Sequence, residues 1–437
     1  MTHDLEDLKS GKLIGTKRLK LACGLKEFPE EIYTLADTLE ILDLSDNQFS
    51  ELPENFIKLK HLKILFFARN NFTVFPPILA KFKNLNMIGF KSNQLKTVPE
   101  NAFPPKLNWL ILTDNQIDKL PKSIGDAHLL QKCALSGNRI EELPDEMAKC
   151  TNLELLRISA NQLQAIPDWL FELPKLSWIA FSGNPVSHHI QFEDDLTAFD
   201  WNEFEVEELI GEGASGFISK ANWNTKNRPV AVKVFKGDVT SDGLPEDEME
   251  VSIAAGSHQN LIPVLGKIKN HSEGKSALIM ELISTSYINL GYPPSMETCT
   301  RDVFEEDVTY NGDELLKMAK GMASVCAQLH AKGINHGDLY AHNILIDEKA
   351  ESFLGDFGAA SFYNKESNLA AKIERVEVRA FGCLIEDILG LIPEHKISID
   401  WRKEWQALIV ACSLPNVQSR PNFEEIEKKL AQFEYKK

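Results

Sequence analysis

The segment His336-Gly337-Asp338-Leu339-Tyr340-Ala341-His342-Asn343 runs into the apolar stretch Ile344–Ile346, and Asp356-Phe357-Gly358 follows thirteen residues after Asn343. The apolar stretch predicts a short strand between two polar turns. An Asp and an Asn five residues apart on one turn, with a second Asp after the strand, form the arrangement that phosphoryl transfer from ATP requires. We expect Asp338 to orient the acceptor hydroxyl, and Asn343 and Asp356 to hold Mg²⁺ against the phosphates.

A glycine-rich turn, Gly211-x-Gly213-x-x-Gly216, lies upstream between strand-like residues. Dinucleotide-binding folds use the same motif, but they need a helix that begins at the third glycine. Here Phe217-Ile218 continues a strand, and Val230–Phe235 is a second predicted strand that carries Lys233 among apolar residues. A lysine in such a run is costly unless its charge is used, so we expect Lys233 to bind a ligand rather than to snorkel at a sheet edge.

These motifs occur in the order and approximate spacing of the protein-kinase family, which residues 204–437 resemble. Two later features also fit: Arg420-Pro421 resembles the family's late Arg-Pro motif, and Val378–Ile385 resembles the long central helix of its C-terminal lobe. The resemblance implies that Lys233 holds the α- and β-phosphates of ATP and is oriented by a helix glutamate. Family spacing falls between Glu248 and Glu250, and we favour Glu248.

The resemblance implies ATP and Mg²⁺ as cofactors. It makes Asp338 the catalytic base, acting with Lys233 and Asn343, and it makes Asn343 and Asp356 the metal ligands. The implied ATP-binding set comprises Gly211, Glu212, Gly213 and Gly216 of the glycine-rich turn, then Ile218, Ala231, Lys233 and Glu248, the pocket residue Met280, the hinge residues Glu281 and Ile283, and finally Asn343 and Asp356.

The sequence also departs from the family pattern. Gly337 stands where the family commonly has an Arg that receives a phosphate on the activation loop, so we do not expect switching by phosphorylation of that loop. The segment from Asp356 to Glu377, which aligns to the start of the central helix, is short and lacks Ala-Pro-Glu, so the platform for a peptide acceptor is reduced. Tyr340 stands where serine/threonine kinases have a Lys, and His342 supplies part of that role only when it is protonated.

The acceptor therefore stays open between three classes of function. A protein serine/threonine kinase whose repeats recruit the substrate is the function we favour, and the complete ATP and metal residues favour an active enzyme over a pseudokinase. His-Gly-Asp with a short following loop also resembles kinase-like enzymes that act on small molecules, such as aminoglycoside and choline phosphotransferases. The third class is a catalytically silent ATP-binding scaffold. An acceptor screen separates the first two, and Mg·ATP binding without turnover identifies the third.

The first half of the chain is periodic. Before most of the repeating asparagines the pattern is Leu-x-x-Leu-x-Leu-x-x-Asn, as in Leu39–Asn47, which is the leucine-rich-repeat signature. Each repeat predicts one short strand that cannot bury its apolar edge alone, so neighbouring repeats stack into a solenoid. We expect each asparagine to satisfy backbone groups at a turn, and each proline to start the return segment. The series are Asn47, Asn70, Asn93, Asn115, Asn138, Asn161 and Asn184, and Pro53, Pro76, Pro99, Pro121, Pro144 and Pro167.

One column of the predicted strand face is unusually apolar. Its residues lie six positions before each asparagine, and a solvent-facing column of this kind predicts an interface because large apolar patches are uncommon on monomers. We expect it to bind a protein partner or the chain's own C-terminal domain; partial cover by neighbouring side chains is the other reading. The residues of this column and the next that we expect to contribute are Ile64, Phe66, Met87, Trp109, Ile111, Leu155 and Trp178.

Composition narrows the partners. A formal net charge of −17 argues against nucleic acid and against an anionic membrane surface. The seven cysteines are dispersed, and the N-terminal residues are polar and acidic without the pattern of a secretory signal, so we expect a cytoplasmic protein. His188 and His189 are adjacent, but we expect ordinary surface histidines rather than a metal site.

The predicted architecture is an α/β multidomain chain: a leucine-rich-repeat solenoid over residues 1–187, a linker or cap over 188–203, and a bilobal, protein-kinase-like α+β domain over 204–437. This combination resembles the leucine-rich-repeat protein kinases found in bacteria.

Overall fold

The computed structural model describes residues 2–187, 196–213, 215–237 and 239–433. Contacts divide the chain into two compact units, one of Met1–Leu173 with Asn184–Val186, the other of Pro174–Gly183 with Ser187–Lys437. His188 and His189 lie outside the described residues. None of the helices in the described parts of the chain combines the length and the hydropathy that a bilayer span requires.

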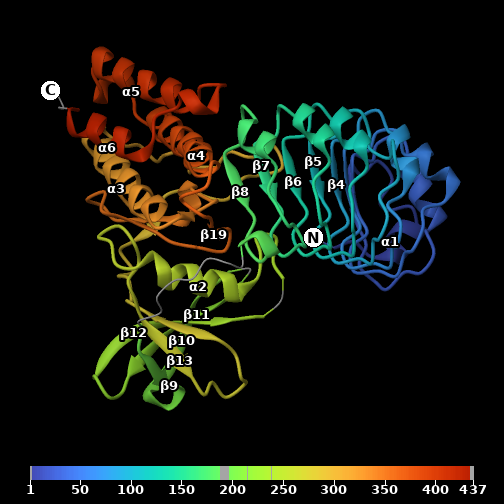
Figure 1. Ribbon diagram of the computed structural model, residues 1–437. Helices are drawn as coiled ribbons and strands as arrows, with labels where there is room; N and C mark the ends of the chain where they lie inside the picture. The colour runs from blue at the N-terminus through green and yellow to red at the C-terminus, as the bar shows by residue number, and fades with distance from the viewer. Residues whose placement is uncertain (1, 188–195, 214, 238, 434–437) are drawn as a thin grey trace. The chain divides into compact units, whose positions relative to one another are not determined.

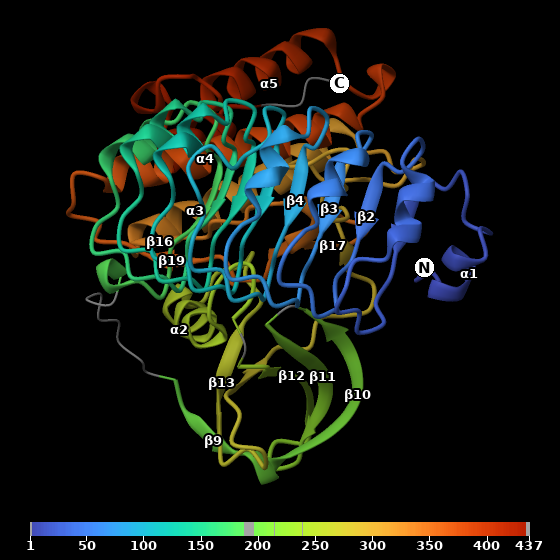
Figure 2. The same ribbon diagram turned by 90° about the vertical axis from the view of Figure 1, so that its right-hand side faces the viewer.

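The repeats form one strand each, as the sequence predicts. Each strand pairs in parallel with the strand of the next repeat, so that Ile41 is opposite Ile64 and Ile64 is opposite Met87. Figures 1 and 2 show β2 to β6 side by side along this sheet. The eight strands in sheet order are β1 (Arg18–Lys20), β2 (Ile41–Asp43), β3 (Ile64–Phe66), β4 (Met87–Gly89), β5 (Trp109–Ile111), β6 (Lys132–Ala134), β7 (Leu155–Arg157) and β8 (Trp178–Ala180).

The repeating asparagines bind the backbone of the neighbouring coil. Asn115 shows the pattern: its Nδ2 donates to Phe90 O at 2.9 Å and to Leu112 O at 3.0 Å, and its Oδ1 accepts from Leu95 N at 3.0 Å. The other six repeat this arrangement, from Asn47 with Leu21 O to Asn184 with Ile158 O. The amide therefore satisfies buried backbone groups where each coil turns, as expected from the sequence.

The return segments are short 3₁₀ helices that begin after a proline. Proline occupies the N-cap position of each, and its fixed φ suits the entry into the turn. No such helix follows Pro99 in the described structure. The helices are η1 (Glu30–Leu35), η2 (Glu54–Lys58), η3 (Pro77–Lys81), η4 (Lys122–Asp126), η5 (Asp145–Lys149) and η6 (Asp168–Glu172), and α1 (Leu5–Lys9) precedes them.

The apolar column is less exposed than the sequence suggests. Met87, Leu155 and Trp178 are buried, and Ile64, Phe66, Trp109 and Ile111 are partly buried. Within the first unit, neighbouring side chains cover the face: Phe66 fills the space beside Gly89, and Lys132 Nζ lies 4.1 Å from the Trp109 ring centroid. The column is therefore only partly solvent-facing: side chains of adjacent repeats cover part of it in the first unit, whereas Trp178 is buried in the second unit against Tyr340. Its role in binding a partner stays a prediction.

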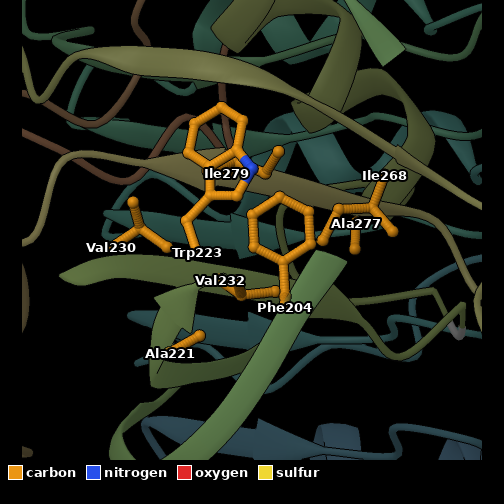
Figure 3. Close-up of a cluster of buried hydrophobic side chains, with 8 residues drawn as sticks. All are labelled: Phe204, Ala221, Trp223, Val230, Val232, Ile268, Ala277 and Ile279. Carbon is orange, nitrogen blue, oxygen red and sulfur yellow. The ribbon is translucent and has the colours of Figure 1, made fainter. Parts of the chain in front are cut away.

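The second unit begins with a six-stranded sheet in the order β10-β11-β12-β14-β13-β9. Buried Phe204, Trp223, Val232 and Ile279 are among the side chains that pack on one of its faces (Figure 3). Residues 198–200, expected in a linker, form strand β9, which pairs in parallel with β13 while Phe199 covers Gly266. The strands are β9 (Ala198–Asp200), β10 (Phe204–Glu212), β11 (Gly216–Trp223), β12 (Arg228–Phe235), β13 (Val264–Lys269) and β14 (Ala277–Met280); helix α2 spans Pro245–Ala255.

The remainder of this unit is mostly helical, with short strand pairs between the helices. The predicted central helix exists, but it begins at Ala370 rather than near Glu377. Ile373, Val376 and Ala380 are buried at helical spacing, so the apolar face already starts there. The helices are α3 (Gly312–Ala331), α4 (Ala370–Gly390), α5 (Ile399–Cys412) and α6 (Phe423–Ala431); the strands are β15 (Ile288–Asn289), β16 (Ile334–Asn335), β17 (Ile344–Ile346), β18 (Ser352–Leu354) and β19 (Ser361–Phe362).

Candidate active site

Asp338 lies on the turn between β16 and β17 and is partly exposed. Asn343 ends the short 3₁₀ helix Ala341–Asn343, and its Nδ2 donates to Asp338 O at 2.9 Å and to Asp338 Oδ2 at 2.8 Å. The two residues therefore fix one another across the turn. Because the atoms of an amide lie on opposite sides of one planar group, Asn343 presents its Oδ1 away from Asp338.

A buried glutamate holds the start of this turn. Glu377 on α4 accepts from Gly337 N at 2.6 Å and from His336 N at 3.1 Å, and His330 Nε2 lies 2.7 Å from its Oε2. Burial alone raises the pKa of Glu377, but the hydrogen bond from His330, together with the nearby His336 and the Gly337 N–H, outweighs it and keeps the pKa below its ordinary value. The backbone before Asp338 is therefore anchored to the helix by an ionised carboxylate.

Lys233 on β12 forms an ion pair with Glu248 on α2. Both side chains are largely buried, at 12% and 3% exposure, whereas Glu250 is exposed. Burial raises the pKa of Glu248; Lys233 opposes this shift and Asp356 adds to it. A buried pair of this kind is weak evidence for stability, because desolvation of two charges offsets their attraction. Its position in a ligand pocket indicates a functional reason for keeping it.

Asp356 follows β18 and is exposed. Its φ of +51° is in the left-handed region, and Gly358 N donates to its Oδ1 at 3.1 Å. The next residue, Phe357, packs against the His336 ring with centroids 5.1 Å apart, and His336 Nε2 lies 3.0 Å from Gly355 O. These contacts keep the Phe357 side chain inside while the Asp356 carboxylate faces outward.

The pocket beside Lys233 has a volume of about 80 Å³. Its lining includes Ile218, Lys233, Glu248, Met280 and Asp356, which come from both lobes of the second unit. Ala231 is opposite Met280 in the sheet and is buried. This sheet register places the predicted apolar residues around one concave site.

The predicted hinge residues follow Met280, which lines this pocket, but Glu281 and Ile283 are not among its lining residues. Glu281 N already donates to Pro263 O at 2.9 Å, so Glu281 can offer only its carbonyl group to a ligand. The Glu281 side chain is turned to Arg228, with Oε2 2.5 Å from Nη2. Ile283, two residues later, is partly buried.

The glycine-rich turn closes on itself. Gly213 N donates to Gly216 O at 3.0 Å, and a Cβ on Gly216 would lie only 2.6 Å from Val234 O. Glycine is therefore required at position 216 by the close approach of β12. Lys236 contacts both Glu212 Oε1, at 2.8 Å, and Gly213 O, at 3.0 Å. Ala214 lies outside the described residues.

The donor set near Asp338 fits Mg²⁺. The exposed Asp356 carboxylate and the Asn343 Oδ1 are hard oxygen ligands, and Mg²⁺ bound to a nucleotide needs only one or two protein ligands because phosphates and water supply the rest. Asn343 and Asp356 would hold the ion, and Asp356 lines the same pocket as Lys233 and Glu248.

His342 lies next to these groups. Its Nδ1 is 2.7 Å from Asp302 Oδ1, and its backbone N donates to Asp302 Oδ2 at 3.2 Å. Burial lowers the pKa of His342, but the hydrogen bond to Asp302 and the charge of Asp338 outweigh this and raise it above the ordinary value. The shift is in the direction that the role expected of His342 requires.

Two positioning residues were missed from the sequence. Glu377 had a usable signal, because an acid flanked by Val376 and Val378 on an apolar helix face must be paired if it is buried. Asp302 had none: it lies 40 residues from His342, in a segment without a recognisable pattern.

Comparisons with known proteins agree with this geometry. A family model described as "Protein kinase domain" matches residues 204–380. Two models described as leucine-rich repeat match residues 128–186 and 38–59.

Three curated relatives match part of the chain. Fibroblast growth factor receptor 1 of Pleurodeles waltl is 29% identical over 202 residues, which is 42% of this chain and 24% of the relative. A "Probable serine/threonine-protein kinase" of Dictyostelium discoideum is 28% identical over 40% of this chain and 10% of its own length. Phytosulfokine receptor 2 of Arabidopsis thaliana is 32% identical over 36% of this chain and 15% of its own length. The matched regions thus span at most about a quarter of these relatives.

Among solved structures, a leucine-rich-repeat protein of Leptospira interrogans is 31% identical, with a TM-score of 0.39, over 41% of this chain and 46% of that protein. The repeat signature, the parallel repeat sheet, the site geometry and the family matches agree. The chain therefore carries leucine-rich repeats in its N-terminal part, followed by a protein kinase domain.

Proposed function

We propose that the chain is an ATP- and Mg²⁺-dependent phosphotransferase and, more narrowly, a serine/threonine protein kinase. The observation that carries the proposal is that the Lys233–Glu248 ion pair and the Asp338–Asn343 pair coexist with an inward Phe357 and an outward Asp356. Kinase activity requires the lysine–glutamate pair and the metal-binding Asp to be in place together.

The chain's own residues divide the work. Lys233, oriented by Glu248, neutralises the α- and β-phosphates, while Gly211, Gly213 and Gly216 let the backbone of the glycine-rich turn lie close to them. Asp338 accepts the hydrogen bond of the acceptor hydroxyl and takes its proton. Asn343 and Asp356 would hold Mg²⁺, which would supply charge neutralisation at the transferred phosphoryl group.

His342 supplies the positive charge on the acceptor side in place of the Lys that Tyr340 replaces. Its side chain is fixed by Asp302, and against the effect of burial the hydrogen bond to Asp302, together with the nearby carboxylates, raises the pKa of His342 above its ordinary value. A fixed cation beside a transferred phosphoryl group stabilises the charge that develops there.

The acceptor is a protein serine or threonine hydroxyl in the first proposal. It is supported by the kinase family match and by the likeness to a relative named as a serine/threonine-protein kinase. A small-molecule hydroxyl is the second candidate. The specific observation in its favour is the early start of α4 at Ala370, which leaves few residues after Asp356 to hold a peptide.

The repeats recruit a protein partner in this proposal. Phe66, Trp109 and Ile111 are partly exposed on the strand face of the first unit. Aromatic side chains such as Trp and Phe are frequent interface anchors because they bring a large apolar area to the contact.

The test is turnover of [γ-³²P]ATP with Mg²⁺, with protein and small-molecule fractions counted separately. Asp338→Asn is compared with wild type, and Asp400→Asn, which changes a carboxylate that is 94% exposed, is the matched control. We expect Asp338→Asn to lower turnover by at least about 100-fold and the control to match wild type. Label on a small molecule selects the second candidate, and equal turnover in wild type and Asp338→Asn rejects the proposal.

A further inference from the structure

The segment Pro174–Gly183 carries the last strand of the repeat sequence, β8, yet it belongs to the second compact unit. Within this unit, the Trp178 indole stacks on the Tyr340 ring with centroids 4.4 Å apart and planes 9° from parallel. Its Nε1–H donates to Leu339 O at 3.2 Å, and Trp178 and Tyr340 are only 1% and 4% exposed. Trp178 therefore contacts the two residues that directly follow Asp338.

The backbone of β8 contacts the same loop from another direction. Asn335 Nδ2 donates to Ile179 O at 3.0 Å, and Phe181 N donates to Ser361 Oγ at 2.9 Å. Asn335 and Ser361 are themselves opposite one another in the β16–β19 pair. The segment thus binds both the strand that enters the Asp338 turn and the strand that follows Asp356.

This contact explains the glycine at position 337. Gly337 has φ +72°, and a Cβ there would overlap Ile179 O and lie 2.7 Å from Ala359 O. A side chain at this position would be strained and would also push β8 away from the loop. The residue that replaces the family's Arg is therefore the one that lets β8 approach.

Two arginines fasten the start of the segment. Arg379 Nη1 lies 2.5 Å from Ser177 Oγ, and Arg420 Nη2 donates to Pro174 O at 2.7 Å. Arg420 is 1% exposed, and its other guanidinium hydrogen bonds go to Leu414 O and Arg375 O. Burial, together with the charge of Arg379, lowers the pKa of Arg420 to about 10. A buried guanidinium bound to carbonyl groups needs each acceptor, so losing Pro174 O would be costly.

We infer that Pro174–Gly183 is part of the catalytic unit and that Trp178 is a positioning residue, which acts on Asp338 through Leu339 and Tyr340. The expected effect on rate rests on the proposed phosphotransferase function. The contact of Trp178 with Leu339 and Tyr340 does not depend on that function. A misplaced catalytic group costs rate even when ligand binding is intact, because the reacting atoms must be held in a near-attack geometry. Trp178 contacts Leu339 and Tyr340 rather than Lys233 or Glu248, so its loss should affect kcat more than nucleotide affinity.

The experiment uses the full chain with Trp178→Phe and Trp178→Ala, and with Trp169→Phe as the matched control. Trp169 lies on η6 in the first unit, and its Nε1 donates to Asp145 at 3.1 Å. Three quantities are measured: kcat at saturating Mg·ATP, the Kd for Mg·ATP, and amide hydrogen exchange over residues 335–343.

We expect Trp178→Ala to lower kcat by about 100-fold while the Kd for Mg·ATP changes less than about twofold. Exchange over 335–343 should rise in this variant and stay at the wild-type level in the control. Trp178→Phe keeps a ring to stack on Tyr340 but loses the hydrogen bond to Leu339 O, so it should recover most of the rate.

The outcomes separate the two proposals. Unchanged exchange over 335–343 in Trp178→Ala overturns the inference, and so does a wild-type kcat in that variant. If the wild type shows no turnover but exchange over 335–343 still rises in Trp178→Ala, the proposed function is rejected. The assignment of β8 to the second unit then stands. A parallel loss of kcat, Mg·ATP binding and the thermal unfolding transition would show that Trp178 serves folding alone, which contradicts a positioning role.

Discussion

Trp109 and Trp178 occupy the same position of the repeat, six residues before an asparagine, but their surroundings differ. Trp109 in the first unit is partly exposed and lies under the ammonium group of Lys132. Trp178 is buried against the turn that carries Asp338. The comparison teaches that a repeat pattern determines where a side chain stands on the strand but not what it contacts.

The same contrast holds for polar groups in the two units. In the repeats, the buried asparagines bind backbone groups one coil away, and every repeat solves the same problem in the same way. In the second unit, Glu248, Glu377 and Arg420 are buried charges with different partners. Variants of the repeating asparagines should therefore change stability, whereas variants of the buried charges in the second unit should change turnover or its pH dependence.

The largest effect is expected at Lys233. Lys233→Met keeps the length of the side chain but removes the charge that we propose to bind the phosphates, and it leaves Glu248 buried without its partner. We expect turnover to fall by about 1,000-fold while the repeat unit stays folded. Turnover and Mg·ATP binding are measured beside Lys220→Met, a change on β11 at a lysine that pairs with Glu207. Activity within tenfold of wild type would contradict the assigned role.

A repeat asparagine should affect stability rather than chemistry. Asn115→Ala leaves Phe90 O and Leu95 N without their hydrogen-bond partner in the buried turn, which should cost about 3 kcal/mol of unfolding free energy. Urea unfolding of the first unit measures this loss. Asn71→Ala serves as the control. Asn71 is exposed and directly follows the repeating Asn70, so its loss should cost below about 0.5 kcal/mol. Equal costs for the two variants would contradict a structural role for the repeating asparagines.

Glu377 gives a prediction on pH. Its folded-state pKa is lowered, so the stability it contributes is present above the unfolded pKa of about 4.3 and is lost as pH falls through the folded value. Glu377→Gln should therefore cost about 2 kcal/mol at pH 7, and the difference from wild type should shrink as pH falls below about 4. Unfolding free energies at several pH values check this. A difference that stays constant down to pH 3 would contradict an ionised Glu377.

The smallest effect is expected at a surface ion pair of the repeats. Arg69 and Asp46 form a two-pronged pair, but their side chains are 59% and 42% exposed. Arg69→Ala should cost less than about 1 kcal/mol and leave turnover unchanged, because solvent and salt screen such pairs. A loss of more than about 2 kcal/mol in the free energy of urea unfolding would contradict the expectation that exposed ion pairs contribute little to stability.

Much of the fold was predictable because its signals are periodic or local. The asparagine and proline series predicted the coils, and the spacing of Lys233, Asp338 and Asp356 predicted the order of the strands and turns that carry them. The glutamate partner was harder. Glu248 and Glu250 both fit the spacing, and only the start of α2 at Pro245 determines that Glu248 faces Lys233 while Glu250 is exposed.

The contacts that could not be predicted are those between residues far apart in sequence. Trp178 and Leu339 are separated by 161 residues, and neither local pattern indicates the other. The sequence did mark the place, because Gly337 is an unexplained departure from the family pattern. Its reason becomes visible only when Ile179 O is seen beside it. The early start of α4 and the pairing of β9 with β13 were missed for a similar reason, since packing rather than propensity decides them.

A double-mutant cycle between Trp178 and Tyr340 tests the central claim most directly. Turnover at saturating Mg·ATP is measured for Trp178→Ala, Tyr340→Ala and the double variant, each checked for a wild-type unfolding transition. Because the two rings act as one stacked unit, we predict that the double variant loses no more rate than the more damaging of the two single variants. Losses that simply multiply would mean that the rings act independently, and would contradict the account in which the last repeat strand positions the catalytic turn.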